Sequence, residues 1–133
     1  MPIELEYNKK LNYVLITASG NATVKEAELR MEEISISEVI PSNVNSLWDM
    51  RELLFDHIDM DFIKQFTEVR KKYNDVRGEA KIALLSNSVL AAPLIKLYTI
   101  LSRDLCQKYK VFKTLEEAEQ WLCAEMLKGS ESV

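Results

Sequence analysis

The densest group of side chains that could carry out chemistry lies between residues 49 and 61. It combines carboxylates, a guanidinium and the only histidine of the chain: Asp49, Arg51, Glu52, Asp56, His57, Asp59 and Asp61. Neighbouring carboxylates can act as general acid and base, or they can bind a hard cation such as Ca²⁺. Histidine exchanges a proton near neutral pH more readily than other side chains. This segment is therefore the first candidate for a catalytic or metal site.

The spacing within this segment does not match the metal-binding patterns. A calcium loop needs oxygen ligands at alternate positions and a glycine at its turn, but Ile58 and Met60 stand at such positions and the glycine is missing. A zinc site would need more than one His or Cys. We interpret Asp59 or Asp61 as the cap of a helix that begins near Phe62, and the other charges as a solvated loop. No metal is expected.

Catalytic motifs are also missing from the sequence. It has no GxSxG elbow and no HExxH, and three glycines are too few for a phosphate-binding loop. His57 is the only histidine that could serve as a general base, and no nucleophile accompanies it. We predict no catalytic constellation and no cofactor. If the protein were an enzyme, its charged constellation would be Asp49, Arg51 and His57.

Length and charge limit the remaining classes. The 133 residues fit one domain, which we assign to residues 1–127, with a flexible C-terminal tail at 128–133. A net charge of −4 disfavours nucleic acid as a partner, because phosphates require a basic surface. The chain does have a local basic stretch: Arg70, Lys71, Lys72, Arg77 and Lys81. We interpret these cations as complementing the dipole at a helix C-terminus.

The cysteines and the hydropathy pattern bear on location. Cys106 and Cys123 lie in helical contexts without a metal-binding or CxxC pattern, so we expect two buried or half-buried free thiols in a reducing compartment. The first ten residues lack the apolar run of a signal peptide, and no stretch approaches the ~20 apolar residues of a membrane span. We therefore expect a cytoplasmic protein without stable membrane insertion.

Alternating and helical patterns define the order of elements. Strands are predicted at 3–7 and 11–18, joined as a hairpin, and further strands at 44–49, 81–85 and 109–113. Helices are predicted from Thr23, near Phe62, from Val89 or Ala92 to Cys106, and from Thr114. Thr23 and Glu26 have the spacing of a capping box at the start of the first helix. Segments 51–61 and 75–79 are predicted to be loops. The order ββαβαβαβα predicts an α/β fold: a five-stranded, mostly parallel sheet with an antiparallel first strand and four helices.

Two chain segments are predicted to follow neighbouring strands at the edge where ligands bind in open α/β sheets. They supply the candidate ligand-binding residues Asp49, Arg51, Ser86, Asn87 and Ser88. Free N–H groups at the following helix could bind an anion there. The alternative is that Asn87 or Ser88 only caps that helix.

The predicted third helix has a broad apolar surface. Its main row is Leu90, Leu94, Leu97, Tyr98, Leu101 and Leu105. Ile95 and Ile100 lie off this row, and a helix that is apolar on more than one side is buried further or contacts a partner. We therefore predict self-association, as a homodimer, through this helix. Membrane contact is the alternative.

The arrangement resembles the SpoIIAA-like family, which groups with STAS and SEC14-type (CRAL-TRIO) domains. The resemblance extends from Met1 to Leu122 and rests on the order of MPIELEYN, ITASGNATVKEA, LWDMR, RGEAKIALLS and KVFKTLEEAEQWL. It implies a small βα fold without catalysis. STAS relatives regulate through protein contacts, whereas SEC14 relatives carry lipids in an apolar cavity. The resemblance thus implies either a regulatory interaction domain or a binder of a small apolar or anionic, lipid-like ligand.

The sequence departs from these relatives in two ways. Anti-sigma-factor antagonists of this type carry a phosphorylatable serine directly after the third strand, but here Asp49 is followed by Met50, Arg51 and Glu52, and no Ser or Thr occurs before Thr67. A phosphorylation switch is therefore not expected. SEC14-type carriers are also much longer chains. We further expect Trp48, in a strand, to be largely buried and structural. The same is expected of Trp121 on the inward stripe of the last helix, which also contains Leu115, Ala118, Leu122 and Met126.

Overall fold

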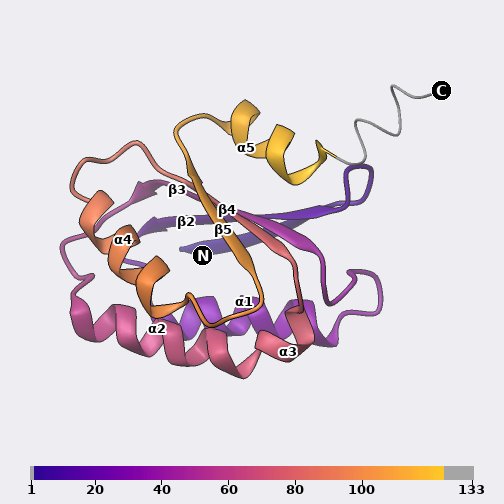
Figure 1. The fold of residues 1–133 in the computed structure, drawn as a ribbon, viewed down its shortest axis with the longest axis horizontal. Helices are drawn as coiled ribbons and strands as arrows, with labels where there is room; N and C mark the ends of the chain where they lie inside the picture. The colour runs from indigo at the N-terminus through magenta and orange to yellow at the C-terminus, as the bar shows by residue number, and fades with distance from the viewer. Residues whose placement is uncertain (1, 125–133) are drawn as a thin grey trace.

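The computed structural model describes residues 2–124, which form five strands and five helices (Figure 1). The strands are β1 (Ile3–Asn8), β2 (Tyr13–Gly20), β3 (Asn45–Leu53), β4 (Lys81–Leu85) and β5 (Lys108–Phe112). The helices are α1 (Val24–Ile36), α2 (Met60–Lys72), α3 (Asn74–Arg77), α4 (Ala92–Leu101) and α5 (Leu115–Leu122). The predicted tail at 128–133 lies outside the described residues.

The five strands form one sheet in the order β1-β2-β3-β4-β5. β1 is antiparallel to β2, and the other neighbouring strands are parallel. This confirms the predicted fold class, and the helix count differs only by the short α3. The parallel register places Asp49 of β3 opposite Leu85 of β4, so both strands reach the same edge of the sheet.

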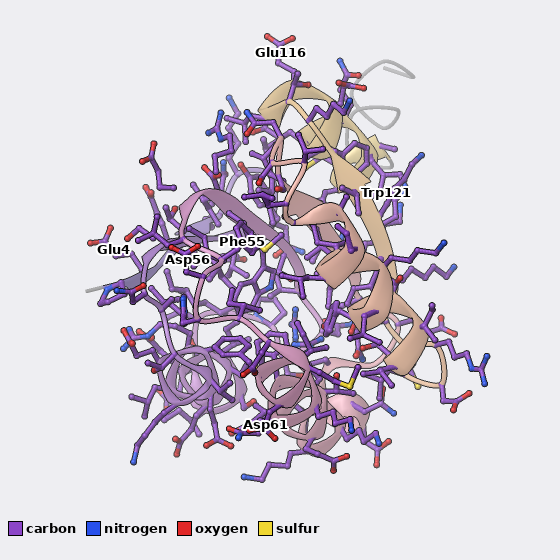
Figure 2. The ribbon with its side chains drawn as sticks, turned by 90° about the vertical axis from the view of Figure 1, so that its left-hand side faces the viewer. Glu4, Phe55, Asp56, Asp61, Glu116 and Trp121 are labelled. Carbon is purple, nitrogen blue, oxygen red and sulfur yellow. The ribbon has the colours of Figure 1, made fainter. Side chains whose placement is uncertain are left out.

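The sheet separates two cores of unequal size. Helices α1, α2 and α4 lie on one face, and α5 lies on the other (Figure 1). Figure 2 shows Trp121 of α5 and Asp61 of α2 on opposite sides of the sheet. The larger core includes Met31 of α1, Ile63 of α2 and Tyr98 of α4. The smaller core packs Ala118 and Leu122 of α5 against the sheet.

The helix starts agree with local sequence chemistry. Thr23 and Glu26 form the predicted capping box of α1, in which each side chain accepts a hydrogen bond from the backbone N–H of the other residue. Asp59 caps α2 by accepting a hydrogen bond from the N–H of Phe62 at 2.8 Å. Thr114 caps α5, and α4 begins at Ala92 with a proline in its first turn.

Two predicted loops begin at different residues in the structure. β3 continues to Leu53, because one extra residue in β3 shifts the register after Asp49 and lets Glu52 and Leu53 pair with Ser19 and Gly20 of β2. The segment expected to be a loop at 75–79 begins with the helical turn α3. This turn closes with a hydrogen bond from the N–H of Gly78 to the carbonyl of Asn74, and Gly78 then has a positive φ of 55°.

The third long helix is shorter than predicted. α4 ends at Leu101, not at Cys106, because the chain turns at Ser102 towards β5. The N–H of Cys106 donates to the side chain of Asn74 at 2.7 Å, which a helical residue could not do without losing its own hydrogen bond. Cys106 is consequently exposed, whereas Cys123 is buried, and both thiols are free.

The two tryptophans differ in burial. Trp48 is 7% exposed and packs edge-on against Phe66, with ring centroids 5.8 Å apart, so its predicted burial is confirmed. Trp121 is only half-buried, because α5 is the single described helix on its face of the sheet. Leu115, expected in the same buried stripe, is 38% exposed. Met126, also expected there, lies outside the described residues.

Candidate functional site

An apolar cavity of about 100 Å³ lies in the larger core, between the sheet and helices α1, α2 and α4. All four of strands β1 to β4 contribute to its walls, as does the loop that follows β3. Its aromatic wall residues are Trp48, Phe55, Phe62, Phe66 and Tyr98. Phe55 comes from the loop after β3 (Figure 2). Such a chamber favours an apolar occupant.

Helix α4 closes one side of this cavity. Leu94, Ile95 and Tyr98 of α4 belong to the wall, and Tyr98 is the only residue of this helix that is buried. The helix packs mainly against α2 and has few contacts with the sheet. An element with so few buried side chains opens at a lower free energy than the central strands do. Of the three long helices around the cavity, α4 therefore forms the least buried wall.

Arg70 is the only charged residue among the described residues that line the cavity. It lies on α2 and is 2% exposed. One terminal nitrogen is 3.3 Å from Oε1 of Gln107 and the other is 3.6 Å from Sδ of Met31. Its Nε is buried without a hydrogen-bond partner. Within residues 2–124, no carboxylate forms an ion pair with this guanidinium.

Two phenols lie beside Arg70. The rings of Tyr98 and Tyr109 meet edge-on with centroids 5.3 Å apart, and the hydroxyl of Tyr109 is buried without a partner. Burial by itself lowers the pKa of Arg70, but the neighbouring phenols of Tyr98 and Tyr109 more than offset this, so the pKa is raised. Arg70 therefore keeps its positive charge inside the protein.

A second buried arginine lies nearby. Arg77 of α3 is 1% exposed and donates from a terminal nitrogen to the carbonyl of Ser42 at 2.8 Å. Burial, and next the like charge of Arg70, lower the pKa of Arg77 to about 10. Two buried cations without a carboxylate partner in the described chain make this end of the core strongly electropositive.

The predicted position of the basic stretch at a helix C-terminus is confirmed for Arg70, Lys71 and Lys72 in the last turn of α2 and for Arg77 in that of α3. The burial of the two arginines was not predicted: Lys71 and Lys72 are exposed, but Arg70 and Arg77 are buried. One signal was present in the sequence. Arg70 follows Ile63 by seven positions and Phe66 by four, so it continues the inward stripe of α2.

The predicted ligand-binding residues lie elsewhere. Asp49 and Arg51 pair with each other, and the hydrogen bond from Arg51 lowers the pKa of Asp49. Trp48 and Met50 line the cavity, so alternation along β3 directs Asp49, which stands between them, to the other face. Neither Asp49 nor its partner Arg51 belongs to the cavity wall. The structure therefore brings Met50, and not its neighbours, to the cavity.

The serine-rich segment lies beside the same strand edge. Ser86 is buried, and its N–H donates to the carbonyl of Phe112 at 3.0 Å. The N–H of Ser88 approaches the hydroxyl of Ser86 at 3.4 Å, and Asn87 is exposed. None of the three lines the cavity. Their predicted role in ligand binding stays a prediction.

His57 has a structural contact in the folded chain. Its Nε2 lies 2.7 Å from the carbonyl of Ala22, which makes Nε2 the protonated nitrogen, and its ring packs edge-on against Phe62. This contact ties the loop after β3 to the start of α1. His57 lies on a different segment from the Asp49–Arg51 pair, which is engaged within itself.

Comparison with solved structures identifies the fold. A crystal structure of an uncharacterized protein of the DUF3478 family, from Shewanella loihica PV-4, is described as having a SpoIIAA-like fold. It matches 91% of this chain and 92% of its own length, with a TM-score of 0.62 and 18% identity. The chain has a SpoIIAA-like fold. The likeness at this identity concerns the fold alone.

The other comparisons add no family. Neither the protein-family models nor the curated proteins give a match to this sequence. In the described part of this SpoIIAA-like fold, no helix is long and apolar enough to cross a membrane. Nor do three or more His, Cys, Asp or Glu side chains gather as metal ligands anywhere in residues 2–124.

Proposed function

We propose that this domain is a non-catalytic regulatory module that binds a small apolar molecule in the cavity under α4. The observation that carries the proposal is the cavity itself, which has aromatic and aliphatic walls and a weakly held helix as its cover. Regulation by a ligand, in place of phosphorylation, also suits a chain that has no Ser or Thr between Asp49 and Phe66. The occupied cavity would hold α4 in place, and this helix is the predicted contact surface.

The size of the cavity limits the ligand. About 100 Å³ is less than the roughly 150 Å³ of an engineered cavity that binds benzene, and drug-sized pockets start near 300 Å³. The structure as it stands therefore accommodates a short alkyl group. A longer chain enters only if α4 moves away from α2, which its few buried side chains allow.

A cavity-filling variant tests this proposal. Ala27 of α1 is 2% exposed and lines the cavity, so Ala27→Leu should occupy its space. The control is Lys25→Leu, which adds the same side chain to the exposed face of the same helix. Titration with 1-hexanol, followed by NMR shifts of the buried side chains, should show binding to the wild type and to Lys25→Leu only.

A second variant with a smaller change in volume keeps the proposal testable if Ala27→Leu misfolds. Overpacking a core commonly costs about 1–3 kcal/mol, so Ala27→Leu could unfold the domain. Ala18→Val adds less volume to the opposite wall and should weaken hexanol binding in a folded protein. Wild-type protein that gives no shifts up to the solubility limit of 1-hexanol would contradict the proposed function.

Self-association through α4 is the second candidate function. The observation in its favour is that Ile100 is 50% exposed on this helix, and that Val89 and Leu90, just before it, are 88% and 77% exposed. Exposed apolar side chains at both ends of one helix favour a protein-contact surface along it. Sedimentation at micromolar concentration should show a dimer that Ile100→Glu disrupts. A wild-type monomer at all concentrations would remove this candidate.

A further inference from the structure

The buried guanidinium of Arg70 lacks the partner that its charge requires. An ionised group that is removed from water costs several kcal/mol unless it is paired and hydrogen-bonded. Arg70 has one long bond to Gln107, a contact with the sulfur of Met31 and an unpartnered Nε. No carboxylate among residues 2–124 neutralises it. The cavity wall thus contains a buried cation without a carboxylate partner and with an unpartnered Nε–H donor.

The position of Arg70 gives the cavity a polar end. Phe62, Ile63, Phe66 and Arg70 all line the cavity from α2. Phe62 and Arg70 are eight residues apart on this helix, which corresponds to roughly 12 Å at a rise of about 1.5 Å per residue. Phe55 and Phe62 therefore mark one end of the site, near the loop after β3. Arg70 marks the other end, towards the start of the strands.

We propose that the natural occupant is an amphiphilic monocarboxylate, with its carboxylate on Arg70 and its apolar part between α2, α4 and the sheet. This inference rests on the proposed function, because it assigns the ligand class of the same cavity. The free Nε–H and a terminal N–H of a guanidinium point in parallel, and a carboxylate accepts both.

A single negative charge fits this site better than a phosphate does. Apart from Arg70, the polar groups of the cavity wall belong to Thr23, Trp48 and Tyr98. A phosphate monoester carries nearly two negative charges and three strongly hydrated oxygens, which these walls would leave largely unsatisfied. One carboxylate balances the single guanidinium that lines the cavity among the described residues, since Arg77 is not part of its wall.

The test compares hexanoate with 1-hexanol, two probes with the same chain length. The variant is Arg70→Met, which removes the charge and keeps the length of the side chain. The control is Lys71→Met, which removes an exposed cation from the next position of α2. Calorimetric titration should show that the wild type and Lys71→Met bind hexanoate about tenfold to a hundredfold more tightly than hexanol. Arg70→Met should lose this preference and still bind hexanol.

Stability without ligand gives a second readout. If Arg70 awaits a ligand anion, Arg70→Met should leave the urea midpoint of the unliganded protein unchanged or raise it, because a buried unpaired charge is removed. Added hexanoate should then raise the midpoint of the wild type and not that of the variant. A large fall in the midpoint of unliganded Arg70→Met would show that Arg70 is a structural residue, and would overturn the inference.

The outcomes separate this inference from the proposed function. Equal binding of hexanol and hexanoate by the wild type, unchanged in Arg70→Met, would overturn the carboxylate assignment and leave the apolar site standing. Binding of neither probe would overturn both. Arg70→Gln, which is also neutral, repeats the comparison with a polar side chain if Arg70→Met fails to fold.

Discussion

The two tryptophans should contribute unequally to stability. Trp48 is 7% exposed in the larger core, whereas Trp121 is half-buried under α5. Trp48→Ala removes an indole that is nearly out of water and that packs edge-on against Phe66. Trp121→Ala removes a ring that packs against Phe112 at 5.7 Å and lies under the ammonium of Lys81 at 5.3 Å. The first substitution should therefore be the more damaging.

The magnitudes follow from the burial. Truncation of a fully buried Trp costs about 3–5 kcal/mol, so we expect about 4 kcal/mol for Trp48→Ala. Trp121 keeps part of its indole in water in both the folded and unfolded states, which reduces the expected loss to about 2 kcal/mol. Total stability of such a domain is about 5–15 kcal/mol, so both variants should fold.

Urea unfolding followed by far-ultraviolet circular dichroism measures both losses without relying on tryptophan emission. With an m value of about 1.5 kcal/mol/M, the midpoints should fall by roughly 2.7 M for Trp48→Ala and roughly 1.3 M for Trp121→Ala. Trp48→Phe and Trp121→Phe, which keep an aromatic ring, should lose less than the corresponding alanine variants. Equal losses, or a larger loss for Trp121→Ala, would refute the inference that Trp48 is the more deeply buried of the two rings.

Two further predictions concern ionisable groups. Burial, followed by the hydrogen bond to Glu119, raises the pKa of Tyr13 from 10.0 to about 12, so the folded state favours the protonated phenol. The contribution of this protonated phenol to stability is complete below pH 10 and is lost as the pH rises towards 12. Tyr13→Phe should therefore reduce the fall of the urea midpoint between pH 10 and pH 12. An equally steep fall of the midpoint in the variant would contradict the raised pKa of Tyr13. Cys106 is exposed whereas burial raises the pKa of Cys123, so a thiol reagent should label Cys106 rapidly in the native protein and Cys123 only after unfolding. Rapid native labelling of both thiols in the single Cys→Ser variants would be the opposite result.

Local patterns predicted the order of elements because their physics acts over a few residues. The capping box of Thr23 and Glu26 joins positions three apart, and Asp59 caps α2 in the same range. The apolar run Lys81–Leu85 became β4 with the predicted bounds. With alternating strands and periodic helices, these features were enough for the fold class, including the antiparallel first strand.

Contacts between distant segments explain most of the errors. β3 exceeds its predicted length because β2 offers pairing partners at Ser19 and Gly20, and α4 stops early where Asn74 binds the backbone of Cys106. Hydropathy alone does not show how many helices pack on each apolar face of the sheet. Trp121 is half-buried for this reason, since α5 packs without a neighbouring helix among the described residues.

The candidate site likewise depends partly on local sequence patterns and partly on contacts between distant segments. Composition and motifs supported a domain without a catalytic constellation, and strand order pointed to the edge of the sheet at Asp49 and Ser86. The cavity lies on the other face from Asp49, and its one charged wall residue within the described chain is Arg70, which the sequence placed only in a basic stretch at a helix C-terminus. A side chain's charge is local information, but its burial depends on segments far away in the chain. Three helices from separate parts of the sequence had to pack on one sheet before Arg70 could lie inside the protein.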